Sequence, residues 1–146
     1  MSASQHENAL ERAAHPEHHP AFDQFVATIS ALRAPDGCPW DREQTHSSIA
    51  HNMIGEAYEA GGAIGGGDVT HMREELGDVL LQVVLQSQIA ADAGEFDIED
   101  VAADVDAKMV RRHPHVFGDE AAAGASEVLN LRDKVKLQEK QAADQA

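Results

Sequence analysis

The sequence contains little cysteine, few aromatic residues and no long apolar run. Cys38 is the only cysteine among 146 residues, so no disulfide can form within the chain, which fits a reducing compartment. Aromatic residues make up 4% of the chain and hydrophobic residues 42%, which predicts a largely aliphatic core. No stretch approaches the ~18 apolar residues of a membrane span, and the first residues lack an apolar secretory segment. We therefore expect a soluble, cytoplasmic protein that does not contact membranes.

Basic residues are also scarce. The chain has 11 Lys and Arg against 26 Asp and Glu, which gives a formal net charge of −15. Binding to a nucleic acid polymer requires a basic surface, so we expect none. A small phosphorylated ligand stays open, because a few local cations or a metal ion can hold it. Acidic residues can also serve solubility alone, so their positions must decide.

The apolar residues recur every three or four positions, and no series of strands is evident. This periodicity indicates an all-α domain over residues 20–141, preceded by a tail at residues 1–19 and followed by a frayed end at residues 142–146. The predicted helices span about residues 20–33, 46–64, 69–93, 98–113 and 127–140. Thr45 or Ser47 is expected to cap the second helix, and Asp68 or Thr70 the third. The second and third helices should form an antiparallel hairpin within a bundle.

Glycines crowd the stretch "MIGEAYEAGGAIGGGD", residues 53–68. One interpretation is a phosphate-binding loop. Such a loop needs a preceding strand and a Gly-Lys-Ser/Thr ending, and neither is present. Asp68, which follows the last glycine, would repel phosphate. Gly65 to Gly67 therefore predict the turn of the helical hairpin.

Four carboxylates are placed symmetrically about that turn. Glu56 and Glu59 lie three residues apart, so they share a face of the second helix. Glu75 and Asp78 repeat this spacing on the third helix. The midpoint between the two pairs is Gly67, and positions equidistant from a hairpin turn lie at the same height. The four carboxylates are therefore predicted to face one another.

Such a cluster needs a positive charge beside it, because like charges at one level repel. Residues 53–72 contain no Lys or Arg, and Arg73 is the only one between there and Lys108. A hard divalent cation fits better, since Mg²⁺ and Mn²⁺ prefer oxygen ligands. A di-iron site would use Glu-x-x-His pairs, which are absent. The symmetry of the two pairs favours a Mg²⁺ site, with Mn²⁺ as a substitute, over acids that line a solvated face.

The same residues carry a family resemblance. "GEAYE" followed by "EELGD" resembles the E-E-x-x-E … E-x-x-D signature of the MazG family of nucleoside triphosphate pyrophosphohydrolases. The flanking stretches "LRAPDGCPWDREQTH", "GDVLLQVVLQSQIA" and "RRHPHVFGD" are similar too, so the resemblance runs from about Phe22 to Lys140. It implies an all-α domain whose four-helix, Mg²⁺-binding core is completed by dimerisation. It also implies hydrolysis of NTPs or dNTPs to the monophosphate and pyrophosphate, as in house-cleaning of nucleotide pools.

The resemblance assigns roles to individual residues. The metal ligands, which are also the catalytic groups, are Glu56, Glu59, Glu75 and Asp78. Lys108 and Arg112 match cations that contact the triphosphate, and their own spacing independently places two cations on one helix face. Trp40 is a candidate for the base pocket, although an aromatic anchor for its loop explains it as well. The spacing does not single out one carboxylate as general base.

Two positions depart from the family pattern. Gly55 stands where the family usually has its first Glu, and Arg132 stands where it often has a Trp beside the nucleotide. A guanidinium can also stack, so Arg132 is kept as a substrate-binding candidate. Lys136 keeps the basic position of the last helix. Tyr58, between the first two acids, is expected to pack.

These departures keep a second interpretation open, namely a catalytically degenerate helical dimer that binds a nucleotide or a protein partner. A third is a bundle without any site, whose melting temperature would not respond to Mg²⁺. The symmetric carboxylates favour the enzyme.

Overall fold

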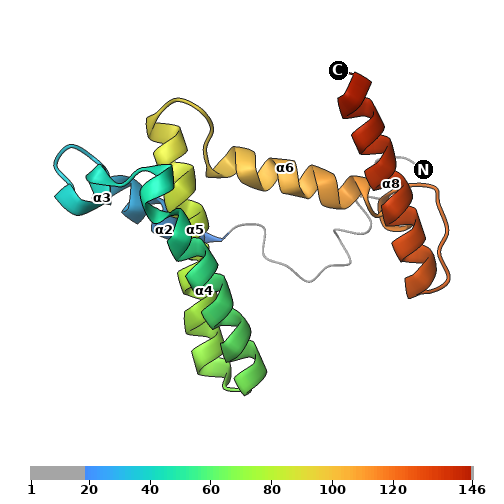
Figure 1. Ribbon diagram of the computed structural model, residues 1–146, viewed down its shortest axis with the longest axis horizontal. Helices are drawn as coiled ribbons and strands as arrows, with labels where there is room; N and C mark the ends of the chain where they lie inside the picture. The colour runs from blue at the N-terminus through green and yellow to red at the C-terminus, as the bar shows by residue number, and fades with distance from the viewer. Residues whose placement is uncertain (1–18, 146) are drawn as a thin grey trace. The chain divides into compact units, whose positions relative to one another are not determined.

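The computed structural model describes residues 19–145, so most of the tail predicted at residues 1–19 lies outside the described residues. The described chain forms helices only, which confirms the all-α prediction (Figure 1). In chain order these are α2 (Pro20–Leu32), α3 (Pro39–Glu43), α4 (His46–Gly66), α5 (Val69–Asp92), α6 (Ile98–Arg111), α7 (Pro114–Phe117) and α8 (Ala125–Gln145). None of them is long and apolar enough to cross a membrane.

The described chain divides into two compact units. The first covers residues 19–101 and contains α2 to α5 with the first turn of α6. The second covers residues 102–145 and contains the rest of α6 with α7 and α8.

In the first unit, α4 and α5 form the predicted antiparallel hairpin (Figure 1). Thr45 caps α4, since its hydroxyl accepts from the Ser48 N–H while the Ser48 hydroxyl accepts from the Thr45 N–H. The helix continues to Gly66, so only Gly67 is a turn residue. Gly67 has φ of 76°, a left-handed conformation that favours glycine. Asp68 then caps α5 by accepting from the N–H groups of Thr70 and His71.

The register of the hairpin can be read from two contacts at its far end. The Nδ1 atom of His46 on α4 lies in hydrogen-bond contact with the Gln86 side chain on α5, and Gln86 Nε2 donates to the His46 carbonyl over 3.1 Å. Positions 46 and 86 therefore lie at one level. Positions near 56 and 76 must then lie at one level too, which is the geometry that the symmetry about the turn predicts.

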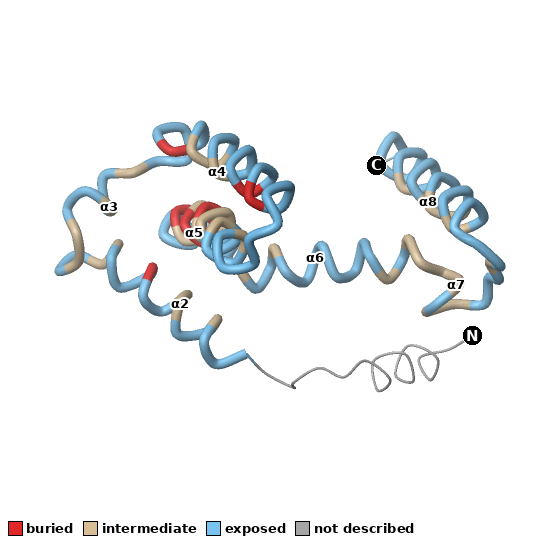
Figure 2. The backbone as a smooth tube through the Cα atoms, turned by 90° about the horizontal axis from the view of Figure 1, so that it is seen from below, coloured by how far each residue is buried: buried red, intermediate tan, exposed pale blue. Residues whose placement is uncertain are grey.

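The core of this unit lies between the hairpin and α2. Its buried members are aliphatic and lie on α2, α4 and α5, where Figure 2 shows buried residues in red. Phe22 and Phe25 of α2 pack against them. They are Ile29, Ile49, Val84, Leu85 and Ile89. Nearer the turn, the buried residues of α4 are Ala60 and Ala63, whose small side chains allow the two helices to approach closely. The carboxylates lie between the aliphatic core and the turn.

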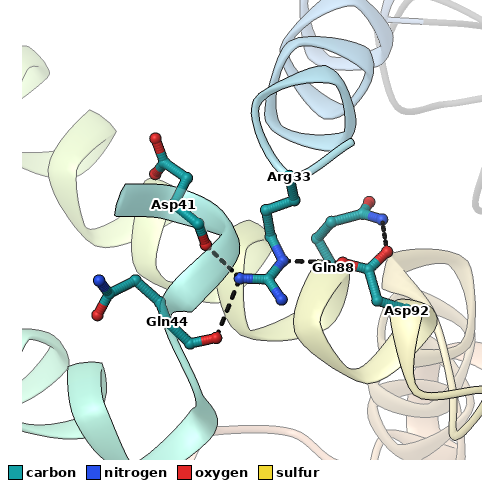
Figure 3. Close-up of polar contacts among 5 residues, drawn as sticks. All are labelled: Arg33, Asp41, Gln44, Gln88 and Asp92. Atoms are coloured by element: carbon teal, nitrogen blue, oxygen red, sulfur yellow. Dashed lines mark hydrogen bonds and ion pairs between the residues drawn. The ribbon is translucent and has the colours of Figure 1, made fainter. Parts of the chain in front are cut away.

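The segment before α4 is also tightly held, although the sequence predicted a plain loop that here contains α3. Arg33 Nε donates to Asp92 of α5 over 2.8 Å, and its Nη1 donates to the carbonyls of Asp41 and Gln44 (Figure 3). At Gly37 a Cβ atom would lie 2.3 Å from the Ala31 carbonyl oxygen, so only glycine fits there. This rigid segment presents Trp40, which is 59% exposed.

The second unit has a different character, because none of its helices contains a fully buried residue (Figure 2). The segment "HVFGDEAAAGA", predicted as a loop, begins within the short helix α7. Pro114 occupies the first turn of α7, where its missing N–H has no cost. α8 runs on to Gln145, where the sequence predicted an end near Lys140.

Candidate metal centre

Three of the four predicted carboxylates converge between α4 and α5. Glu56, Glu75 and Asp78 each offer a carboxylate oxygen, and these oxygens all lie within 4.8 Å of one another. All three residues are half-buried. The hairpin therefore brings together acids that lie about twenty positions apart in the sequence.

Glu59 lies outside this cluster and is exposed. The helix explains the difference between the two acids of α4. Glu56 lies on the same stripe as Ile49, Ala60 and Ala63, which are buried. Three residues beyond Glu56, Glu59 is turned about 60° away around the axis. Its role as a fourth ligand stays a prediction.

The carboxylates of this cluster repel one another. Burial raises the pKa of the Glu56 carboxyl above its usual value, and the nearby charges of Asp78, Glu59 and Glu75 raise it further. The Oε2 atoms of Glu56 and Glu75 are buried and accept no hydrogen bond from any described residue. Buried acceptors of this kind are rare in folded proteins unless a partner is missing.

Few positive charges lie in this unit to offset the carboxylates. The basic residues of positions 19–101 are Arg33, Arg42 and Arg73. Among the described residues, no Lys or Arg forms an ion pair with the three acids. The nearest cationic candidate is His71, whose Nε2 lies 3.3 Å from Glu75 Oε1. An oxygen-only set with unpartnered buried acceptors fits a hard divalent cation, so these three residues could hold one.

The predicted substrate cations belong to the second unit. Lys108 and Arg112 lie on one face at the end of α6, with Lys108 exposed and Arg112 half-buried. Their neighbours are not evident from the sequence. Arg111 and Arg112 share the carboxylate of Glu139 on α8, and Arg112 Nη2 donates to Glu139 Oε2 over 3.1 Å. These hydrogen bonds, that from Arg112 first, lower the pKa of Glu139 to about 2.

This unit also contains buried donors without acceptors. The Nε atoms of Arg112 and Arg132 are buried and lack a hydrogen-bond partner among the described residues. Arg132 belongs to the packed face of α8, which also carries Val128, Val135 and Glu139 at helical spacing. That spacing was the available signal that Glu139 points inward. Lys136 is exposed on the same helix.

Trp40 lies ahead of the hairpin that carries the carboxylates. It lies on α3, ahead of α4, and Glu56 is ten residues beyond the start of α4 at His46. Ten residues of helix span about 15 Å. The contribution of Trp40 to a base pocket stays a prediction.

The hairpin and its converging acids define an all-α protein with a candidate divalent-cation site. The family model of the MazG nucleotide pyrophosphohydrolase domain matches residues 44–117, half of the chain, so the chain belongs to the MazG family. The matched residues extend across both compact units. This confirms the resemblance found in the sequence.

Individual relatives agree. The chain is 52% identical over 98 residues to the nucleoside triphosphate pyrophosphohydrolase/pyrophosphatase MazG of Thermotoga maritima, covering 67% of this chain and 38% of the relative. It is 44% identical over 120 residues to the nucleoside triphosphate pyrophosphohydrolase of Escherichia coli, covering 82% and 46%. It is also 49% identical over 123 residues to the uncharacterized protein YabN of Bacillus subtilis, covering 84% and 25%. The chain spans less than half the length of each of these relatives.

Proposed function

We propose that the chain is a Mg²⁺-dependent nucleoside triphosphate pyrophosphohydrolase. It would cleave an NTP or dNTP between the α and β phosphates, with water as co-substrate, to give the monophosphate and pyrophosphate. The observation that supports this most is the convergence of Glu56, Glu75 and Asp78, with two buried oxygens that accept no hydrogen bond. The names of the relatives are consistent with the same reaction. In the cytoplasm such an activity would serve house-cleaning of nucleotide pools.

The acidic hairpin needs a cation before it can approach a triphosphate. Glu56, Glu75 and Asp78 would hold Mg²⁺, or Mn²⁺ in its place, with Glu59 as a further ligand. When bound, the cation offsets phosphate charge and activates water. The chain's own carboxylates fix where this charge lies, and their half-buried setting strengthens its effect by limiting solvent.

The cations of the second unit would bind the phosphates. Lys108 and Arg112 supply positive charge, and the unpartnered Nε atom of Arg112 is a donor that a phosphate oxygen can satisfy. Arg112 Nη2 donates to Glu139, while its Nε atom has no hydrogen-bond partner among the described residues. Arg132 and Trp40 are the proposed contacts for the base.

We further propose that the active form is a homodimer. The hairpin exposes large apolar side chains on both helices, including Ile54 at 75% and Tyr58 at 86% on α4 and Leu76 and Leu80 on α5. Tyr58, expected to pack, contacts little of its own chain. A second hairpin would cover such side chains and complete a four-helix core. Light scattering on the purified protein should give twice the chain mass, and a monomer with full activity would contradict the proposal.

A panel of NTPs and dNTPs, incubated with the protein and Mg²⁺, tests the reaction. Pyrophosphate and the matching monophosphate should appear in equal amounts from at least one substrate. Tight binding of a nucleotide without turnover, measured by calorimetry, would instead support a degenerate binding domain. A folded dimer that releases no pyrophosphate from any member of the panel would refute the proposed activity.

A further inference from the structure

Gln82 of α5 is a buried polar residue that neither the family signature nor the core accounts for. It is 6% exposed, and its amide Oε1 is buried without a hydrogen-bond partner among the described residues. A buried amide that makes no hydrogen bond destabilises a typical protein. Apolar residues occupy the neighbouring buried positions Val84 and Leu85, so the polar group calls for an explanation.

The position of Gln82 connects it with the carboxylates. It lies seven residues after Glu75 and four after Asp78, so the three side chains share one face of α5. That face is directed at α4, because Gln86, one turn further on, contacts His46. Long side chains on a helix lean back toward its N-terminus, which directs the Gln82 amide toward the turn that carries Asp78.

The unpartnered atoms of this unit form a consistent set. Within residues 19–101, the buried side-chain atoms that lack a partner are Glu56 Oε2, Glu75 Oε2 and Gln82 Oε1. All three are acceptors, and all three lie on α4 and α5. A ligand that satisfies them together must bring positive charge for the carboxylates and a hydrogen-bond donor for the amide.

A hydrated divalent cation meets both requirements. Mg²⁺ normally keeps several water molecules, and each can donate a hydrogen bond. Four residues of helix separate Gln82 from Asp78, a rise of about 6 Å. The separation suits an amide that contacts a water of the cation and not the cation itself.

We propose that Gln82 is a positioning residue of the metal centre, its amide oxygen accepting a hydrogen bond from a water molecule on the cation held by Glu56, Glu75 and Asp78. The inference rests on the proposed metal site. It adds a neutral group that orients the cation's water, the kind of outer contact whose loss typically lowers metal affinity by about 10–100-fold.

The test compares Gln82→Met with Gln86→Met, measuring Mn²⁺ affinity from the electron paramagnetic resonance signal of free Mn²⁺ and, separately, the melting temperature without metal. Gln82→Met should weaken Mn²⁺ binding about tenfold while the metal-free melting temperature stays the same or rises. Gln86→Met removes the hydrogen bonds to His46, so it should lower the metal-free melting temperature and leave Mn²⁺ affinity unchanged. If the role of Gln82 were purely structural, Gln82→Met would lower the metal-free melting temperature and leave Mn²⁺ affinity unchanged.

The outcomes separate this inference from the proposed reaction. If Gln82→Met binds Mn²⁺ as tightly as the parent, the role of Gln82 is overturned and the metal site stands. If the parent binds no Mn²⁺, both the role of Gln82 and the metal site are overturned. A parent that binds Mn²⁺ and releases no pyrophosphate removes only the reaction, and the affinity comparison still decides the role of Gln82.

A second measurement covers the case in which Gln82→Met fails to fold. A crystal structure of the unaltered protein with Mn²⁺ should show a metal-bound water within hydrogen-bond distance of Gln82 Oε1. An amide turned away from every metal-bound water would overturn the inference.

Discussion

The two compact units differ in the kind of buried polar atom that each leaves without a partner. Within residues 19–101 these atoms are acceptor oxygens, on Glu56, Glu75 and Gln82. Within residues 102–145 they are nitrogens, two of them on the guanidinium groups of Arg112 and Arg132. The unpartnered atoms of the first unit therefore need a cation or hydrogen-bond donors, and the unpartnered guanidinium nitrogens of the second need an acceptor such as an anion.

The distribution of charge follows the same division. Every lysine of the chain lies at or beyond position 108, and residues 19–101 contain three arginines among many acids. The net charge of −15 hides this contrast, because a whole-chain sum cannot show which segment holds the basic residues. The scarcity of basic residues is therefore a property of the first unit more than of the whole chain.

The largest expected effect comes from removing a proposed metal ligand of the first unit, residues 19–101. Asp78→Asn should lower pyrophosphate release by at least about a hundredfold, because even outer contacts of metal sites cost about 10–100-fold when lost. Glu74→Gln is the matched control, since Glu74 is an exposed acid on the same helix. The rate of release under saturating Mg²⁺ measures both. Retained turnover in Asp78→Asn would remove that residue from the site.

The packing of the two units should differ in stability. Leu85 is buried in the core, so Leu85→Ala should lower the free energy of unfolding by about 2–5 kcal/mol. Leu131 on α8 is only half-buried, and Leu131→Ala should cost about 1 kcal/mol. Denaturant unfolding monitored by circular dichroism gives both values. Equal losses would mean that α8 is as well packed as the hairpin.

A fall in pH should destabilise the second unit, residues 102–145, before the first. The pKa of Glu139 is about 2 in the folded protein, against 4.5 for an ordinary glutamate, because Arg112 and Arg111 stabilise its charged form. A depressed pKa contributes stability that is complete above pH 4.5 and is lost as the pH falls toward 2. Amide signals of α8 in an NMR titration should report this loss, and Glu139→Gln should abolish its pH dependence. If the acid transition were unchanged in that variant, Glu139 would not be its cause.

The smallest effect concerns the metal-free hairpin. Because burial and neighbouring acids raise the pKa of Glu56, its charge destabilises the folded protein at neutral pH without metal. Glu56→Gln should therefore raise the metal-free melting temperature slightly and remove the further rise that Mg²⁺ gives the parent. Scanning calorimetry with EDTA and with Mg²⁺ checks both. A variant that still gains stability from Mg²⁺ would show that Glu56 is no ligand.

The sequence predicted the hairpin and the convergence of three of its acids, because both follow from the spacing of residues about one turn. It missed α3 and α7, since helices this short have no apolar period and are set by a proline in their first turn. It extended α8 too little, because "QAADQ" lacks an apolar face although Ala and Gln favour helix. Glu139 was missed because its partners lie about 28 residues away, on another helix.

The exposure of Glu59 shows the limit of arguments from helix faces. Residues three apart share a broad face, but about 60° of rotation separates an acid directed at the partner helix from one at the edge. Gln82 shows the opposite case. It is a neutral residue on the same face of α5 as Glu75 and Asp78, and only its burial distinguishes it from other polar residues of the helix.

The most direct test of the central claim is the initial rate of pyrophosphate release from an NTP mixture, titrated with Mg²⁺ after treatment with EDTA. The rate should be negligible without metal, rise to saturation with Mg²⁺, and fall again when EDTA is restored. Release that is independent of Mg²⁺, or absent at every concentration from the folded protein, would contradict the assignment of the hairpin carboxylates as a catalytic metal centre.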